Sequence, residues 1–367
     1  MIDPRVAGLA QILVRYSTKV SEGETCVIEG PTAAEPLIAA VYEEVLNAGG
    51  HPIVTMSFEG QPVTYYDLAS EAQLDWVSPL SRWAAEESDC RIAIGADTNT
   101  RQLSRVDPAR QTRRQAATRE LMELTMRRAA DGSHRWVYTL FPTNGYAADA
   151  EMSLRAFEDF YFGACLVNEE DPLGAWKRAS AECHRLAEWI EGHSEVHVTA
   201  PGTDIRLGIE GRKFIPCDGE HNMPDGEFFT GPVEDSVEGE VSFHLPAVIG
   251  GREVTGVRFK FESGRIVDAS AERNEEYLIK LIDTDEGARR LGELGIGTNY
   301  GIDRGTRDVL LDEKIGGTVH MAVGAAYPES GGTNESAVHT DLVCDLRQGG
   351  RIEVDGELFQ ENGVFKV

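Results

Sequence analysis

The last quarter of the chain contains residue types whose spacing suits metal binding. His339 and Asp341 lie two positions apart in the apolar run Ala-Val-His-Thr-Asp-Leu-Val-Cys. In an extended strand, positions i and i+2 point to the same face, so one imidazole and one carboxylate are presented together. His320 lies in a second extended-looking run, residues 318–323. If the two strands pair, three nitrogen and oxygen ligands converge, and such a set suits zinc, manganese, cobalt or ferrous iron.

A structural role competes with this interpretation. A single histidine in an apolar strand is more often a hydrogen-bonded core residue than a ligand. Here two such histidines occur, one of them with a carboxylate on the same face. They lie among glycine-rich turns and paired carboxylates in residues 312–332. Taken together, these features leave the core and ligand interpretations evenly balanced.

Two more carboxylates could complete a metal centre. Glu227 follows a turn-forming Pro-Asp-Gly and begins an extended run, and Glu293 lies among glycines in residues 291–299. Either residue alone fits a solvated turn. With His320, His339 and Asp341, however, they make three carboxylates and two imidazoles. Such a set can hold two divalent ions a few ångströms apart, the arrangement used in metal-assisted hydrolysis.

The elements that must position these residues follow from the periodicity of the chain. Apolar spacing and caps predict helices over residues 3–16, 34–48, 70–87, 108–130, 147–167 and 171–191, and buried strands over 24–30, 52–56, 90–95 and 135–140. Strands that alternate with long helices specify a parallel sheet covered by helices. The first half is therefore expected to be an α/β domain with a mostly parallel sheet. It contains no GxGxxG or Walker lysine for phosphate binding.

The pattern changes near residue 194. Residues 195–199, 203–209, 239–243, 252–261 and 265–269 alternate in polarity as antiparallel strands do, and one predicted helix over 274–290 interrupts them. We therefore expect an α/β domain over residues 1–194. A mostly antiparallel α+β domain, carrying the catalytic metal-binding residues, is expected over 195–367.

Composition limits the possible partners and location. The formal charge of −27 argues against nucleic acid, because phosphate binding requires a basic surface. No apolar run reaches the ~20 residues of a membrane span. The start of the chain lacks a signal peptide, so we expect a cytoplasmic protein with no membrane partner. The six cysteines are scattered singly without a CxxC pair, which favours reduced thiols.

Ordered motifs across the second half resemble those of the thermophilic aminopeptidase family, two-metal peptidases of the aminopeptidase T and aminopeptidase S type. The motifs are Asn-Met-Pro-Asp-Gly-Glu (222–227), Gly-Pro-Val-Glu-Asp-Ser-Val-Glu-Gly (231–239), Asp-Glu-Gly-Ala-Arg-Arg-Leu-Gly-Glu (285–293), Gly-Thr-Asn (297–299), Asp-Glu-Lys-Ile-Gly-Gly-Thr-Val-His (312–320), Tyr-Pro-Glu-x-Gly-Gly (327–332) and His-x-Asp (339–341). The resemblance covers essentially the whole chain, weakly in the first half and specifically from residue 222 onward.

The resemblance implies a metallo-aminopeptidase that hydrolyses the N-terminal peptide bond of peptides, using a water activated by two divalent ions (Zn, Co, Mn or Mg). By motif position, the metal ligands would be Glu227, Glu293, His320, His339 and Asp341. Tyr327 would be catalytic, and Glu313 would be a proton-accepting base or a further ligand. The family also implies a homodimer.

One position departs from the family pattern. Where the family commonly has tryptophan between the last histidine and aspartate, this chain has Thr340. Position i+1 of a strand faces away from the metal. We therefore expect the substitution to alter packing or substrate contact and to preserve metal binding.

Two other functions compete with peptide hydrolysis. His320, His339 and Asp341 alone form a two-histidine-one-carboxylate set, which suits a ferrous-iron, ring-cleaving dioxygenase of the dihydroxypyridine type. Glu227 and Glu293 favour the hydrolase, because one iron with open positions needs no further carboxylates. A non-enzymatic scaffold derived from a hydrolase is disfavoured, because every ligand type is present at its motif position.

Overall fold

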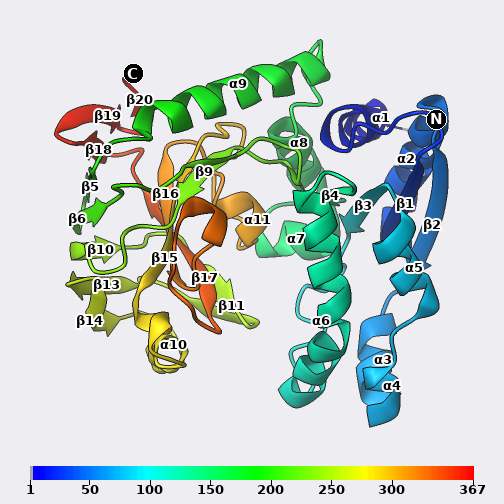
Figure 1. The fold of residues 1–367 in the computed structure, drawn as a ribbon, viewed down its shortest axis with the longest axis horizontal. Coiled ribbons are helices and arrows are strands. Elements are labelled where there is room, and N and C mark those ends of the chain that lie inside the picture. The colour runs from blue at the N-terminus through cyan, green and yellow to red at the C-terminus, as the bar shows by residue number, and fades with distance from the viewer. Residues whose placement is uncertain (1–2) are drawn as a thin grey trace. The chain divides into compact units, whose positions relative to one another are not determined.

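A computed structural model describes residues 3–367. Met1 and Ile2, which belong to the segment predicted to lack a signal peptide, lie outside the described residues. The chain divides into two compact units (Figure 1). Unit 1 contains the chain up to Trp176 together with Gly219–Pro224, and unit 2 contains Lys177–Asp218 and Asp225–Val367. The predicted domain boundary near residue 194 stays a prediction. No helix of residues 3–367 is long and apolar enough to cross a membrane.

Unit 1 is built on one parallel sheet. Its strands are β1 (Thr25–Pro31), β2 (His51–Ser57), β3 (Cys90–Gly95), β4 (Arg135–Leu140) and β8 (Asn222–Met223), in the order β2-β1-β3-β4-β8. Every neighbouring pair is parallel, which confirms the predicted α/β class of the first half. The short β8 comes from the later part of the chain and extends the sheet beside β4.

The helices of unit 1 follow the predicted ranges in part. The helix expected over residues 147–167 is two helices, because Ser153 caps the start of the second one, and the helix Gln61–Leu68 was not predicted. They are α1 (Pro4–Gln11), continued by a π-helical turn (Ile12–Ser17), α2 (Glu35–Asn47), α3 (Gln61–Leu68), α4 (Glu71–Asp75), α5 (Pro79–Glu87), α6 (Pro108–Ala130), α7 (Asn144–Asp149) and α8 (Leu154–Ala164), and α9 (Pro172–Ile190) continues into unit 2. The single helix expected over residues 70–87 is two helices, because Pro79 cannot continue the preceding one and begins α5. Ser78 caps α5 through its side-chain oxygen.

Tyr161 of α8 ties the helix to the end of β4. Its buried hydroxyl accepts a hydrogen bond from the Leu140 amide at 2.9 Å and donates one to the Met223 carbonyl at 2.9 Å.

Replacing Tyr161 by Phe leaves a buried amide without this partner, so unit 1 should lose about 1–3 kcal/mol of unfolding free energy. Urea unfolding followed by circular dichroism measures this change. The exposed Tyr42→Phe serves as control, and equal midpoints for both variants would contradict the expectation.

Unit 2 is antiparallel throughout its named sheets. An eight-stranded sheet has the order β14-β13-β10-β6-β5-β18-β19-β20. It contains β5 (Glu195–Ala200), β6 (Thr203–Gly208), β10 (Glu238–Ser242), β13 (Arg258–Glu262), β14 (Arg265–Ser270), β18 (Arg351–Val354), β19 (Glu357–Glu361) and β20 (Val364–Phe365). A two-stranded ribbon pairs β11 (Ala247–Ile249) with β12 (Arg252–Val254). This confirms the mostly antiparallel class predicted for the second half.

The third sheet of unit 2 carries the motif residues. It runs in the order β17-β16-β15-β9-β7 and contains β7 (Ile215–Cys217), β9 (Glu227–Thr230), β15 (Leu291–Gly297), β16 (Thr318–Gly324) and β17 (His339–Asp345). The helix predicted over 274–290 is shorter, since α10 covers Glu275–Ile282 and a separate 3-10 turn covers Gly287–Arg289. A four-residue helix, α11 (Val309–Asp312), precedes β16.

Alternation along these strands divides the third sheet into a core face and a polar face. Phe228, Leu294, Ile296, Met321 and Leu342 belong to the hydrophobic core of unit 2, to which α9 also contributes. Because side chains alternate along a strand, the residues between them point to the opposite face. That opposite face therefore receives Glu227, Glu293, His320 and Asp341.

Candidate metal centre

All five predicted ligands lie on the polar face of the third sheet. Glu227 begins β9, Glu293 is on β15, His320 is on β16, and His339 and Asp341 are on β17. The strands β16 and β17 pair antiparallel, with Ala322 opposite Asp341 and Gly324 opposite His339, which meets the condition for His320 to lie near His339 and Asp341. The i, i+2 spacing therefore places the last two ligands on one face, as expected.

Glu293 lies between the two imidazoles. Its Oε1 is 3.0 Å from Nε2 of His320, and its Oε2 is 3.6 Å from Nε2 of His339. Glu227 Oε2 lies 3.4 Å from the same His320 nitrogen, and Asp341 Oδ2 lies 3.8 Å from Nε2 of His339. Each oxygen of Glu293 thus faces a different histidine, as a bridging carboxylate requires.

The ligand-type atoms form two neighbouring groups. One contains Glu227, Glu313 and His320, and the other contains Glu293, His339 and Asp341. Within each group, one nitrogen or oxygen atom per residue lies within 4.8 Å of the others. Two such groups of mixed nitrogen and oxygen donors match the ligand preferences of zinc, cobalt and manganese.

Hydrogen bonds around the groups orient the imidazoles for ligation. Nδ1 of His320 lies 3.0 Å from the Glu313 carbonyl, and Nδ1 of His339 lies 2.8 Å from the Ala325 carbonyl. Donation from each Nδ1–H leaves the Nε2 lone pair directed into the site. Among residues 3–367, Glu227 Oε2 and Asp341 Oδ1 are buried oxygens that accept no hydrogen bond. Buried acceptors of this kind fit a bound cation.

The buried carboxylates of the site favour binding of a positive charge, as the shifted pKa values of its groups indicate. Burial raises the pKa of Glu227 to about 8 and that of Asp341 to about 6, and nearby carboxylates add to both shifts. Burial opposes protonation of His320, but Glu227 and Glu293 outweigh it and raise its pKa to about 10. The cluster therefore attracts protons, and a divalent ion would satisfy the same carboxylates.

A glycine provides the room for this arrangement. Gly295 of β15 pairs with His320 of β16, and a Cβ atom there would lie 2.0 Å from the imidazole ring. Any side chain at Gly295 would therefore displace His320. The glycines around Glu293 in the sequence belong to this buried strand, and Glu293 itself is only 5% exposed.

Tyr327 follows β16 at the rim of the site. Its ring centroid lies 5.1 Å from that of His339, at 69° to it, and 5.3 Å from that of Phe229. Burial, followed by the negative charge of Glu293, raises the pKa of Tyr327 well above its usual range. The phenol therefore stays protonated at neutral pH and can act as a hydrogen-bond donor.

Sequence reasoning assigned no role to Lys314, although it lies within one of the recognised motifs. Its side chain has no exposed surface, and its ammonium donates hydrogen bonds to Glu313 and, at 3.2 Å, to Glu227. The sequence offered one indication of a role. Lys314 adjoins Glu313, a predicted base or ligand, and a lysine is rarely buried without carboxylate partners.

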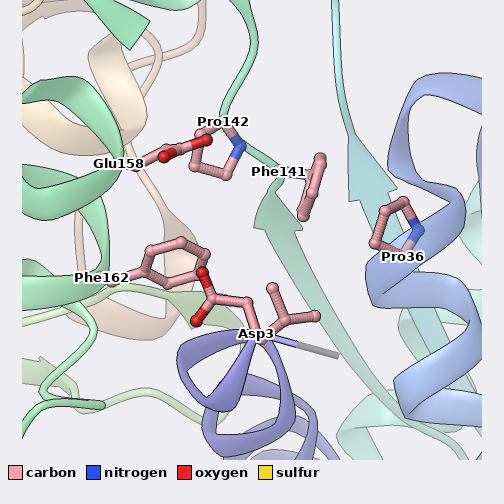
Figure 2. Close-up of a pocket in the computed structure, with 7 residues that line it drawn as sticks. Asp3, Pro36, Phe141, Pro142, Glu158 and Phe162 are labelled. Atoms are coloured by element: carbon pink, nitrogen blue, oxygen red, sulfur yellow. The ribbon is translucent and has the colours of Figure 1, made fainter. Parts of the chain in front are cut away.

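A separate cavity of about 400 Å³ lies in unit 1 (Figure 2). Its walls are mainly apolar and include Phe141 and Phe162. The carboxylates at its edge, Asp3 and Glu158, are paired with Arg5 at 2.9 and 3.6 Å. The cavity shows no group of ligand or nucleophile side chains comparable with the cluster in unit 2.

Comparison with known proteins identifies the family. The sequence profile of the thermophilic metalloprotease (M29) family matches residues 2–365. Aminopeptidase T of Thermus aquaticus is 29% identical over 394 residues, covering 95% of this chain and 94% of that protein. Aminopeptidase AmpS of Bacillus subtilis is 26% identical over 398 residues, covering 95% and 93%.

Solved structures agree with the sequence comparison. Wild-type AmpT from Thermus thermophilus superposes with a TM-score of 0.85 at 26% identity, covering 99% of both chains. The 2,5-dihydroxypyridine dioxygenase of Pseudomonas putida superposes with a TM-score of 0.60 at 12% identity, covering 100% of this chain and 99% of that one, which shows a shared fold. The predicted class of metallo-aminopeptidase is confirmed at the level of the family. The chain belongs to the thermophilic metalloprotease family M29.

Proposed function

We propose that this enzyme removes N-terminal residues from peptides by metal-assisted hydrolysis. The observation that carries the proposal is Glu293, which faces His320 with one oxygen and His339 with the other. Glu227, Glu293, His320, His339 and Asp341 are the proposed ligands of two divalent ions (Zn, Co, Mn or Mg). Bound there, the ions would lower the pKa of a water from ~16 towards neutrality and polarise the peptide carbonyl.

The remaining steps fall to side chains of the chain itself. Glu313 is held by Lys314, and although burial opposes its ionisation, Lys314 and His320 lower its pKa, so it is ionised and able to accept a proton from the attacking water. Its alternative role is that of a further ligand, since it belongs to the group with Glu227 and His320. Tyr327 donates a hydrogen bond to the oxyanion that develops on the substrate carbonyl.

One ion or a nearby carboxylate of the site would hold the free amino terminus of the substrate, which would restrict cleavage to the first peptide bond. Glu227 and Asp341, whose side chains are 7% and 12% exposed, are among the carboxylates at the centre. From the family resemblance we also propose a homodimer, which light scattering would reveal as twice the 40.2 kDa chain mass.

Metal removal tests the proposal directly. Dialysis against a chelator should lower the hydrolysis of a panel of aminoacyl amides by at least about a hundredfold, because the ligands alone cannot activate water. Adding back Zn, Co, Mn or Mg one at a time should restore hydrolysis and identify the preferred ion. Elemental analysis of the purified chain should find two ions.

The same panel distinguishes the hydrolase from the dioxygenase alternative. His320, His339 and Asp341 by themselves would suit one ferrous iron. Glu227 and Glu293, both within 3.4 Å of His320, support the hydrolase. Oxygen consumption with ferrous iron and a dihydroxypyridine, without cleavage of any aminoacyl amide, would reverse the assignment.

A further inference from the structure

Lys314 is a buried cation enclosed by carboxylates beside the candidate metal centre. Its Nζ lies 3.2 Å from Glu227 Oε1 and 3.8 Å from Asp225 Oδ1, and it donates a short hydrogen bond to Glu313. The lysine side chain has 0% exposure, and that of Asp225 has 2%. An ammonium has three N–H donors, and three carboxylates surround this one.

Two of these carboxylates belong to a third group of metal-ligand atoms. Cys217, Asp225 and Glu227 each offer one such atom, and the three atoms lie within 4.8 Å of one another. The sheet builds this group, because Cys217 of β7 is the register partner of Glu227 on β9. A thiolate with two carboxylates is a set that zinc or cobalt would accept. The ammonium of Lys314 contacts both carboxylates of this group.

The backbone holds the lysine in this place. Asn299 donates its amide N–H to the Lys314 carbonyl at 3.0 Å, and its side-chain amide donates to the Asp225 carbonyl at 2.8 Å. One asparagine therefore joins the turn that carries the lysine to the turn that carries its acidic partner. These two hydrogen bonds fix the backbone of Lys314 relative to that of Asp225.

We propose that Lys314 is a positioning residue whose ammonium occupies a third cation position, between Asp225, Glu227 and Glu313. Its hydrogen bonds fix Glu227 and Glu313, so that Glu227 Oε2 faces His320 and the two-ion site. By occupying this position it also keeps a third divalent ion away from Cys217. The inference rests on the proposed function, because the side chains that Lys314 positions are those of the two-ion centre.

Cobalt binding to Lys314→Ala tests the inference. The substitution removes the ammonium and opens space beside Cys217, so the variant should bind three cobalt ions per chain instead of two. A thiolate-to-cobalt charge-transfer band should appear in the near ultraviolet, absent from the parent and lost again in the Lys314→Ala/Cys217→Ser double variant. Turnover should fall about ten- to a hundredfold, as when residues that orient metal ligands are replaced, with KM changed less than threefold.

Thr318→Val is the matched control, because Thr318 is equally buried four residues after Lys314, at the start of β16, and its hydroxyl donates to the Ile315 carbonyl at 3.0 Å. It should keep the parent ion count and spectrum. A folded Lys314→Ala chain with two ions and the parent spectrum overturns the inference. If Lys314→Ala does not fold, Lys314→Met replaces it, because methionine fills the same space without the charge. Parent-like turnover in Lys314→Met overturns the inference. A tenfold fall in turnover at constant KM supports it.

The parent chain separates this test from that of the proposed function. If the parent binds fewer than two ions or cleaves no aminoacyl amide, the proposed function fails whatever Lys314→Ala does. If the parent does both and Lys314→Ala matches it in ion count and spectrum, only the role of Lys314 fails.

Discussion

Replacement of Glu293 by Ala should abolish tight binding of both ions and lower kcat/KM by roughly a thousandfold or more, about 4 kcal/mol of transition-state stabilisation. The expectation follows from its position, since each of its oxygens faces a different imidazole at 3.0 and 3.6 Å. No other carboxylate among residues 3–367 is paired with both histidines in this way. Calorimetric titration with cobalt, together with steady-state kinetics on an aminoacyl amide, measures both effects.

The comparison needs a control that loses a carboxylate elsewhere. Glu357 is exposed at the start of β19, so Glu357→Ala should retain two ions and parent kinetics. If Glu293→Ala also bound two ions with the affinity of the parent, Glu293 would not be the bridging ligand. The ligand set would then have to be reassigned among Glu227, Glu313 and Asp341.

Replacement of Tyr327 by Phe should lower turnover by about 10²–10³-fold, the effect of removing one donor to a developing oxyanion. The ring should stay in place, because it packs against His339 and Phe229 through contacts that do not involve the hydroxyl. Ion binding and KM should therefore remain close to those of the parent. Single-turnover kinetics with the fully metal-loaded enzyme isolates the chemical step.

Tyr300→Phe is a suitable control for Tyr327→Phe. The hydroxyl of Tyr300 donates to the Gly363 carbonyl at 2.7 Å, which is not a proposed ligand, so its removal should leave turnover unchanged. Full turnover in Tyr327→Phe with both ions bound would refute the oxyanion role. A loss of ions in that variant would instead assign Tyr327 to the support of His339.

The fold was predictable where periodicity was strong. The four long strands of the parallel sheet and the 23-residue helix α6 lie where apolar spacing placed them. The helix predicted over residues 70–87 is interrupted because Pro79 acts locally, and β8 was missed because two residues carry no detectable period. Pairing between β4 and β8 depends on contacts between residues some eighty positions apart, which local patterns do not encode.

The sequence identified five side chains that the fold brings together, and it indicated less of what surrounds them. The i, i+2 rule placed His339 and Asp341 together because it depends only on strand geometry. Glu293 was ambiguous because glycines next to it are typical of turns, whereas here Gly295 makes room for the His320 ring. Lys314 received no role because the sequence places only Glu313 beside it, whereas the fold also brings Asp225 and Glu227 to its ammonium.

The distribution of the proposed ligands over four strands links metal binding to the stability of the protein. The segment from Glu227 to Asp341 must be assembled into one sheet before any ion finds its full set of donors, so an unfolded or truncated chain cannot hold the metal tightly. Ion occupancy is therefore linked to the folding equilibrium, and each ion at a free concentration a hundred times its Kd would add about 2.7 kcal/mol to stability. Metal scarcity in the cell would then reduce the lifetime of the enzyme as well as its activity.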